Sequence, residues 1–488
     1  MVGQSWDMIF RFLLCAMMVV PAGSVQSADQ CLSHSEAPEA LISESLVRID
    51  EILSGISPPT NTGIYQAYNL ARAPLDLVYG AEGNQVAEAK VRLSLADYLR
   101  ELPRIGTLQE MHGTVVKIDG FSVKNGSESR RRVPVAVVPG SGEAALSSGS
   151  AIQFGFLVST ALRSAADAGS SVDAEIRALY EFTMNDTLRF YWLEAPAWHW
   201  AGVYPNRKAR SAARFGYFLR LRPAFFQAFT DYDLHIFALA ANLRITLAEW
   251  PELARAGDLA LIDEVLDTAF RAVEERMDGG ESGDGFGFDR GRWRDANGFE
   301  YTACESAAPP QAPCGPPAAD HPDVSHAQRW PQWLRSLSGA AELRGRIDLA
   351  KELEDRRVGL ARQISGAALY WRDQRPVLRN FISGADGWYR YDKDVKGYGH
   401  PPSSLTGWAF GFGAYSALAP LNPDLAKAYR EFCSVIQSDD PKDVAFRVKF
   451  YSQNPISPRP ADAPAKDDYG TSSPAVFACR AYAALGCF

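Results

Sequence analysis

Beyond about residue 150, apolar residues recur at spacings of three and four positions, the pattern of helices that bury one face. Turn signals such as Pro251 and Asn422-Pro423 separate the segments that carry this pattern. No comparable set of alternating strands accompanies them, so we predict a mainly α fold. The expected helices are residues 171–193, 211–228, 232–249, 258–277, 324–343, 346–371, 403–418, 422–436 and 474–486.

The first part of the chain has a different pattern. Residues 39–56 and 86–102 have helical periodicity, but between residues 112 and 139 apolar and polar positions alternate. An Asp119-Gly120 step within the alternating segment is a short hairpin signal. We therefore predict an N-terminal helical region with a small β element over residues 28–148, followed by a helical domain over residues 149–488.

The number of helices limits how they can pack. They are too many for one four-helix bundle, which leaves an α-solenoid or helical hairpins closed into an (α/α)n toroid. The segment between Asp233 and Arg244 is apolar almost all round, with only His235 and Asn242 polar. A helix of this kind fits an inner ring that an outer ring covers. We therefore favour the toroid.

The N-terminus reads as an export signal over residues 1–27. Arg11 precedes the apolar run Phe12–Val20, and the small residues of Val25-Gln26-Ser27 offer a cleavage site. The expected location is therefore periplasmic or secreted. No later run is apolar and long enough for a membrane helix, so we expect no integral membrane segment after signal removal. The net charge of −8 argues against nucleic-acid binding.

Cysteine usage agrees with export. Removing the signal takes away Cys15 and leaves six of the seven cysteines, an even number. Cys304 and Cys314 bracket a proline-rich loop, and we predict that they pair. The remaining cysteines allow three connectivities, among which the sequence does not choose: Cys31, Cys433, Cys479 and Cys487.

The densest group of chemically capable side chains lies between His321 and Trp330. Asp323 is a good N-cap, and His326 and Arg329 follow at intervals of three. Pro331 implies either a kinked helix or a single turn before a helix that starts at Pro331. In both cases Asp323 can orient a neutral His326 as a proton-transfer base at a helix mouth. The alternative is that both residues only cap the helix.

Two further groups contain polar or aromatic candidates. In the apolar segment after Thr230, we expect Asn242 and Thr246 to pair structurally, while His235 is a candidate for substrate contact. The glycine-rich loop around residues 384–402 and the segment after it contain further candidates, although loop packing would also explain the aromatic ones. These candidates are Trp388, Tyr389, Arg390, Tyr391, His400 and Trp408.

The segment 207–214 is strongly basic. We interpret it as a solvent-exposed face, with attraction of a polyanion as the alternative. Motifs for nucleotides, zinc proteases and serine hydrolases are absent from the sequence, and we expect no cofactor and no metal.

The helical segments together with the runs Asp323–Trp330 and Trp388–Tyr391 resemble exported (α/α)-toroid carbohydrate-active enzymes, of the polysaccharide lyase and glycoside hydrolase type. This resemblance concerns architecture and residue type over roughly the C-terminal two-thirds of the chain. A large C-terminal β-sandwich is not evident here. The resemblance implies proton transfer by His326 and Tyr389, and neutralisation of a uronate carboxylate by Arg329 or Arg390. Trp330 joins the aromatic residues expected to bind the sugar.

The function expected from these residues is β-elimination on an acidic, uronate-containing poly- or oligosaccharide. One alternative is a glycoside hydrolase that uses Asp233 and Asp323 as its two carboxylates. Another is a noncatalytic periplasmic protein that binds glycans or supports the envelope.

Overall fold

The computed structural model describes the strands between residues 108 and 146 and residues 148–199, 202–216, 229–280, 283–288, 322–386, 402–412, 414–452 and 474–484. In these residues the fold is mainly helical, as predicted. The expected signal, the helices at 39–56 and 86–102, and the Cys304–Cys314 pair lie outside the described residues. So do Cys31, Cys487 and most of the expected helix 211–228.

The N-terminal strands lie where the alternating pattern predicts a β element. They are β1 (Leu108–Met111), β2 (Val115–Ile118), β3 (Phe121–Lys124), β4 (Arg131–Pro134), β5 (Ala136–Val137) and β6 (Ala144–Leu146). Ile118 pairs with Phe121, so Asp119-Gly120 forms the two-residue hairpin loop that its sequence predicts. One sheet has the order β3-β2-β6-β5, with β2 and β6 parallel, and β1 pairs with β4.

The helical part begins with α5 (Ser148–Asp167), α6 (Ala174–Glu181) and the π-helix η2 (Phe182–Glu194). It continues with α7 (Arg207–Arg214), α9 (Asp231–Glu249), η4 (Pro251–Leu253), α10 (Asp258–Arg276), α11 (Val324–Ala327), α12 (Trp330–Leu343), α13 (Ile347–Gln363) and η6 (Ile364–Ala368). The last helices are α14 (Thr406–Gly411), η7 (Ala414–Leu421), α15 (Pro423–Gln437), α16 (Pro441–Phe450) and α17 (Pro474–Ala484).

Three short hairpins interrupt the helices: β7 (Ala197–His199) with β8 (Gly202–Tyr204), β9 (Met277–Asp278) with β10 (Gly287–Phe288), and β11 (Leu369–Arg372) with β12 (Arg375–Leu378). The sequence pattern shows none of them. The expected helix 346–371 ends at Ala368, where the chain turns into β11. Each strand is at most four residues long, too short for alternation to stand out.

Two helices are also absent from the sequence-based expectation. Most residues of α5 are buried, so its apolar positions do not gather on one face and give no clear period. Helix α16 gives no clear period for the opposite reason, because only Phe446 and Arg447 are buried among its ten residues.

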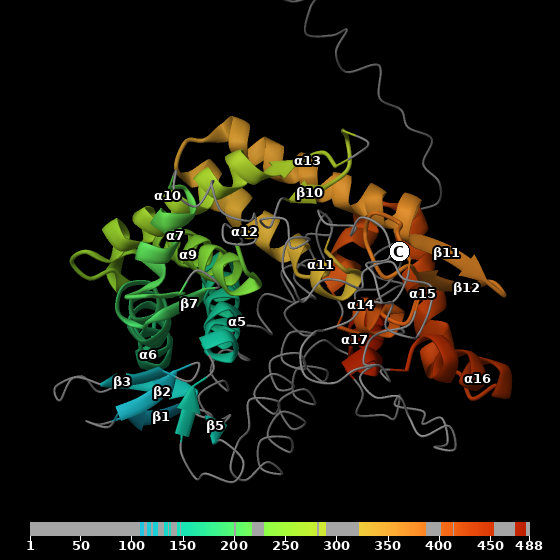
Figure 1. Ribbon diagram of the computed structural model, residues 1–488, viewed down its shortest axis with the longest axis horizontal. Helices are drawn as coiled ribbons and strands as arrows, with labels where there is room; N and C mark the ends of the chain where they lie inside the picture. The colour runs from blue at the N-terminus through green and yellow to red at the C-terminus, as the bar shows by residue number, and fades with distance from the viewer. Residues whose placement is uncertain are drawn as a thin grey trace, which may run out of the picture.

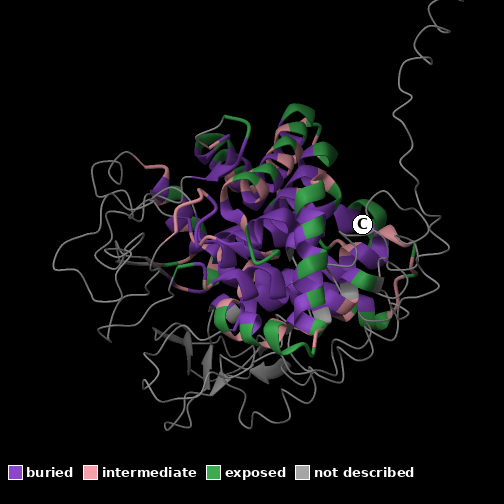
Figure 2. Ribbon diagram, turned by 90° about the vertical axis from the view of Figure 1, so that its right-hand side faces the viewer, coloured by how far each residue is buried: buried purple, intermediate pink, exposed green. Residues whose placement is uncertain are grey.

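The helices follow one another around an arc, from α6 and α5 through α9, α10, α12 and α13 to α15 and α17 (Figure 1). Helix α9 packs against α5 on one side and α12 on the other, and α12 also contacts η7. A helix that comes later in the chain packs on each of these and forms a second layer: η2 on α5, α10 on α9, α13 on α12 and α15 on η7. Buried residues fill the space between the two layers, and exposed ones lie on outward faces (Figure 2).

The polar residues of α9 join this core through hydrogen bonds. The Asn242 amide donates to the hydroxyls of Ser159 and Thr160 on α5, at 3.2 and 3.1 Å, and its oxygen accepts from Ser336 on α12 at 2.8 Å. Thr246 donates to the Asn242 carbonyl at 2.9 Å. The expected structural pairing of Asn242 and Thr246 is therefore confirmed, and it connects three neighbouring helices.

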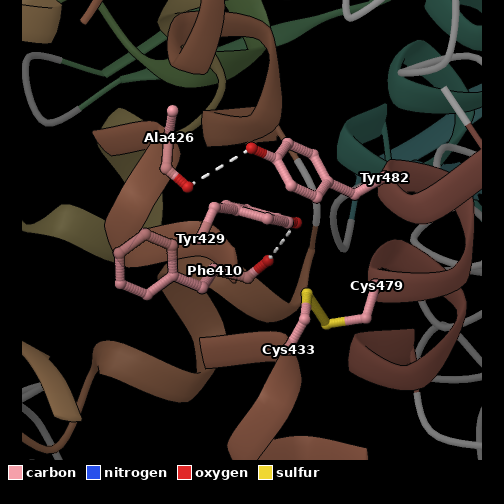
Figure 3. The surroundings of a disulfide bond; sticks show 6 residues. All are labelled: Phe410, Ala426, Tyr429, Cys433, Cys479 and Tyr482. Atoms are coloured by element: carbon pink, nitrogen blue, oxygen red, sulfur yellow. Dashed lines mark hydrogen bonds between the residues drawn. A yellow bond between two sulfur atoms is a disulfide. The ribbon is translucent and has the colours of Figure 1, made fainter. Parts of the chain in front are cut away.

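A disulfide joins the two C-terminal helices. Cys433 on α15 forms a disulfide with Cys479 on α17, one of the pairings that the sequence leaves open (Figure 3). On the same side, the Tyr482 hydroxyl donates to the Ala426 carbonyl at 3.3 Å. Helix α17 also packs on α14, so the disulfide helps to hold α17 against both α14 and α15.

Replacing both cysteines of this bridge by alanine is expected to lower the free energy of unfolding by about 2–4 kcal/mol. The reason is that the bridge closes a loop with a sequence separation of 46 residues and so restricts the unfolded chain. Urea unfolding of the two proteins measures the difference, and reductant should produce a similar loss in the wild type only. Equal unfolding midpoints would contradict this disulfide.

No helix in the described ranges is long and apolar enough to cross a membrane.

Candidate active site

Asp323 begins α11 and holds the next turn through several hydrogen bonds. Its Oδ1 accepts from the backbone N–H groups of Ser325 and His326, at 3.0 and 3.1 Å, and from the Ser325 hydroxyl at 2.5 Å. Its Oδ2 lies 2.7 Å from His326 Nδ1. Asp323 is therefore the N-cap that the sequence predicts, and it also fixes the imidazole ring.

The two side chains differ in exposure. The Asp323 side chain is 4% exposed and that of His326 is 25% exposed. Burial alone would raise the pKa of Asp323, but the neighbouring His326 and the hydrogen bonds from residues 325 and 326 outweigh it and hold that pKa below its ordinary value. The pair is thus a buried carboxylate that orients a partly exposed imidazole.

The segment after His326 shows whether the helix kinks at Pro331 or a new helix starts there. Helix α11 is a single turn that ends at Ala327, and α12 starts at Trp330 with Pro331 in its first turn. The version with a single turn before a new helix is the one observed. The Tyr415 hydroxyl donates to the Val324 carbonyl at 2.8 Å, so this short turn is also held from η7.

Arg329 connects α11 to the start of α9. Its Nη1 donates to Asp231 Oδ2 at 2.5 Å, and both side chains are nearly buried. The Asp231 carbonyl in turn lies 2.8 Å from His235 Nδ1. The observed contact of Arg329 is therefore with a protein carboxylate, which joins the segment after α11 to the first turn of α9.

His235 and Trp330 have the surroundings of core residues. His235 is fully buried and makes edge contacts with Phe156 and Trp333, with ring centroids 5.3 and 4.9 Å apart. Trp330 is 1% exposed and contacts Phe286 and other aromatic rings. We therefore do not include these two residues in the site proposed below.

Trp408 is the expected sugar-binding residue that lies nearest to solvent among the described ones. It is half-buried on α14, where its ring packs edge-on against Phe412 at 5.4 Å. Helix α14 packs against α11, the turn that carries His326. The structure thus brings the elements of Asp323, His326, Arg329 and Trp408 together.

The glycine-rich loop has a firmly held base next to this turn. Asp386 accepts hydrogen bonds from the Ser403 N–H at 2.8 Å and the Ser403 hydroxyl at 2.5 Å, so residues on either side of the loop are joined. Asp386 also accepts from the Asn380 N–H at 3.2 Å. The Asn380 carbonyl accepts from Val324 N at 2.9 Å, and the next residue, Phe381, forms a β-bridge with Asp323.

Ser403 adopts a backbone conformation that is rare for a residue with a side chain. Its φ is +61°, in the left-handed region, and the Tyr370 hydroxyl donates to its hydroxyl at 2.9 Å. Such conformations cost free energy and persist where surrounding contacts hold them. The base of the loop is therefore a constrained element. The loop's predicted site residues, Trp388, Tyr389, Arg390, Tyr391 and His400, lie outside the described residues.

Sequence reasoning missed Asn380 and Ser403, and it assigned no role to Asp386. The signal for Asp386 was weak but present, because an acidic residue stands directly before a run of aromatic and glycine residues. Nothing local distinguishes Asn380 or Ser403, since their partners are distant in the sequence.

The interpretation of segment 207–214 as a solvent-exposed face is wrong. Arg207, Arg210 and Arg214 lie on one side of α7 and are buried against Asp233 of α9. Arg214 Nη1 lies 2.7 Å from Asp233 Oδ2, Arg207 Nη1 lies 3.2 Å from Oδ1, and Arg210 binds Oδ1 as well. The sequence predicts an exposed segment because residues 207–214 are strongly charged. Their counter-charge, Asp233, lies 19 to 26 positions after the three arginines and is not apparent locally.

The charge on Asp233 is strongly stabilised. Burial would raise its pKa, but the three guanidinium groups and the Thr230 N–H hold the pKa well below its ordinary value. Asp233 is therefore an ionised structural carboxylate.

Comparisons with protein-family models, curated proteins and solved structures found no match for this chain. Within the described ranges, no group of three or more His, Cys, Asp or Glu side chains is arranged to hold a metal ion.

Proposed function

We propose that this protein is an exported polysaccharide lyase that cleaves an acidic, uronate-containing glycan by β-elimination. The observation that carries the proposal is the pair formed by buried Asp323 and partly exposed His326 at 2.7 Å. In the proposed reaction, Asp323 fixes the imidazole through Nδ1, and Nε2 exchanges a proton with the substrate.

The layered helices support a toroid as the finer architecture. Neighbouring α5, α9 and α12 form an inner layer, and each is covered by a following helix, as expected of helical hairpins arranged in a ring. Their N-termini lie at one end, since Gly149 lies against Tyr232 and Arg329 binds Asp231.

The proposed mechanism starts with neutralisation of the uronate carboxylate, because the negative charge that develops on it would otherwise be too costly. His326 Nε2 takes the proton from C5, next to the carboxyl group. The electron pair forms the C4–C5 double bond as the bond from C4 to the glycosidic oxygen breaks. The leaving oxygen then receives a proton from an acid, for which Tyr389 is our candidate.

Asp323 contributes to this step through its charge. Once His326 holds the extra proton, the imidazolium lies beside a carboxylate whose pKa is lowered and which therefore remains ionised. The carboxylate stabilises the protonated ring and keeps it in one orientation. Asp323 is thus a positioning residue in the proposed mechanism.

Neutralisation of the substrate carboxylate falls to Arg390 in this proposal. Arg329 is occupied by Asp231 inside the protein. Arg390 and Tyr389 follow Asp386 by four and three positions. Asp386 accepts a hydrogen bond from Asn380, the residue before Phe381, and Phe381 forms a β-bridge with Asp323. The proposal therefore assigns the acid to Tyr389 and carboxylate neutralisation to Arg390.

The hydrolase alternative receives less support from the carboxylates. A glycoside hydrolase needs one carboxylic acid that is protonated near neutral pH, which requires a raised pKa. The pKa values of both Asp233 and Asp323 are lowered, and Asp233 is enclosed by three arginines. This pair is therefore poorly suited to general acid catalysis.

The proposal is tested by incubating the protein with alginate, polygalacturonate and glycosaminoglycans while following two signals. A lyase produces ultraviolet absorbance from unsaturated ends in step with new reducing ends. New reducing ends without absorbance would select the hydrolase, and neither signal on any acidic glycan would overturn the lyase proposal.

A further inference from the structure

Helix α11, the turn that carries His326, is only four residues long. A single helical turn fixes several backbone torsions for few internal hydrogen bonds, so it is not stable by itself. The orientation of the imidazole therefore depends on the contacts that hold the turn. Asp323 supplies the local ones, because its carboxylate accepts from the backbone of the turn and lies 2.7 Å from His326 Nδ1.

Distant parts of the chain hold both backbone groups of Val324, the first residue of the turn. Its N–H donates to the Asn380 carbonyl at 2.9 Å, and its carbonyl accepts from the Tyr415 hydroxyl at 2.8 Å. Val324 is fully buried, and buried backbone groups need such partners. The contact with Asn380 joins two backbones. The contact with Tyr415 comes from a side chain, so a single substitution can remove it.

Tyr415 is itself held in a fixed position. Its side chain is 1% exposed, and its ring packs edge-on against Phe410 of α14, with the ring centroids 6.2 Å apart. It belongs to η7, which contacts α12, α13, α14 and α15. The hydroxyl is therefore a fixed donor between the helical core and the α11 turn. Because it is buried, it acts on the turn and does not contact a substrate.

We propose that Tyr415 is a positioning residue for His326, because its hydroxyl fixes the α11 turn and thereby the orientation of the imidazole. The effect on the ring follows from the geometry alone, and the effect on rate rests on the proposed function. A turn that is released on one side lets the ring leave the orientation that proton transfer requires. A displacement of about 1 Å in a reacting group can lower a rate by up to about 100-fold.

The test replaces Tyr415 by phenylalanine, which removes the hydroxyl and keeps the ring. Tyr451→Phe is the matched control, since Tyr451 is also fully buried and donates to a carbonyl, that of Pro376 in β12, at 2.7 Å. Both substitutions remove one buried hydrogen bond and should lower the urea midpoint of unfolding by similar amounts. On a susceptible glycan, only Tyr415→Phe should lower kcat, by about tenfold, with KM nearly unchanged.

The NMR signals of the His326 ring nitrogens provide a readout that needs no substrate, and the His326→Gln protein identifies them by their loss. We expect Tyr415→Phe to shift or split these signals, and Tyr451→Phe to leave them as in the wild type. Unchanged signals in Tyr415→Phe, or equal changes in both variants, overturn the positioning role.

The kinetic measurement decides separately between the ring and the reaction. A wild-type kcat in Tyr415→Phe, despite shifted ring signals, also overturns the positioning role. If the wild-type protein yields no unsaturated ends from any acidic glycan, the proposed reaction fails, and the ring signals alone decide whether Tyr415 positions His326.

Discussion

Replacement of His326 by glutamine is expected to lower kcat on the susceptible glycan by about 10²–10⁴-fold, the contribution of a positioned proton-transfer group. Glutamine retains polarity and approximate size but cannot take up a proton. Because the His326 side chain is partly exposed, we expect little change in the free energy of unfolding. Initial rates of unsaturated-end formation and a urea unfolding curve for each protein measure the two effects.

Asp323 provides the matched comparison for this prediction. Asparagine caps helices about as well as aspartate, so Asp323→Asn should keep the α11 turn while removing the charge beside the imidazole. We expect a lower kcat with nearly unchanged stability, whereas Asp323→Ala should lose both. Wild-type rates in His326→Gln would remove this histidine from the mechanism. A loss of activity in Asp323→Ala alone would reduce the aspartate to a helix cap.

Replacement of Asp233 by asparagine is expected to lower the free energy of unfolding by about 3–5 kcal/mol, the cost of breaking a buried ion pair from one side. Three buried guanidinium groups would lose their shared carboxylate, and α7 would lose its main attachment to α9. Urea unfolding near neutral pH gives the difference. The control is Lys208→Ala, which removes an exposed ion pair of the same helix and should cost less than about 1 kcal/mol.

The same carboxylate predicts a pH dependence. Since the pKa of Asp233 is lower in the folded protein than in the unfolded chain, its contribution is fully present above the ordinary aspartate pKa of about 3.9. The contribution is lost as the pH falls through the folded value. Asp233→Asn should therefore show a weaker decline in stability with acidification than the wild type. Parallel declines, or costs alike for Asp233→Asn and Lys208→Ala, would contradict the buried cluster.

Elements with one apolar face could be predicted from the sequence. Helices α10 and α15 occur almost where their periodicity places them, and the Asp119-Gly120 step forms its hairpin. Helix α9 is buried almost all round, but the turn signal at Pro251 marks its end in the sequence. Helix α5 could not be found in this way because its burial is almost complete, and α16 because so little of it is buried. The periodicity reports the contrast between two faces of a helix, and both of these helices lack that contrast.

In the candidate site, contacts between residues close in the sequence could be predicted, and contacts between distant residues could not. The Asp323 cap and its contact with His326 follow from a spacing of three residues, so the sequence predicted both. The partner of Arg329 is 98 positions away, and those of the arginines on α7 lie in another helix. Long-range partners decide whether a charged side chain is exposed, held in place or able to meet a substrate, and one sequence does not encode them locally.

The proposed function depends most directly on whether a uronate carboxylate is required for bond cleavage. The decisive measurement is the ultraviolet absorbance formed from an acidic glycan and from the same glycan after chemical reduction of its carboxyl groups. We predict that absorbance appears with the acidic polymer and is absent with the reduced one. Cleavage of both polymers, or of the reduced one alone, would contradict β-elimination as the reaction of this protein.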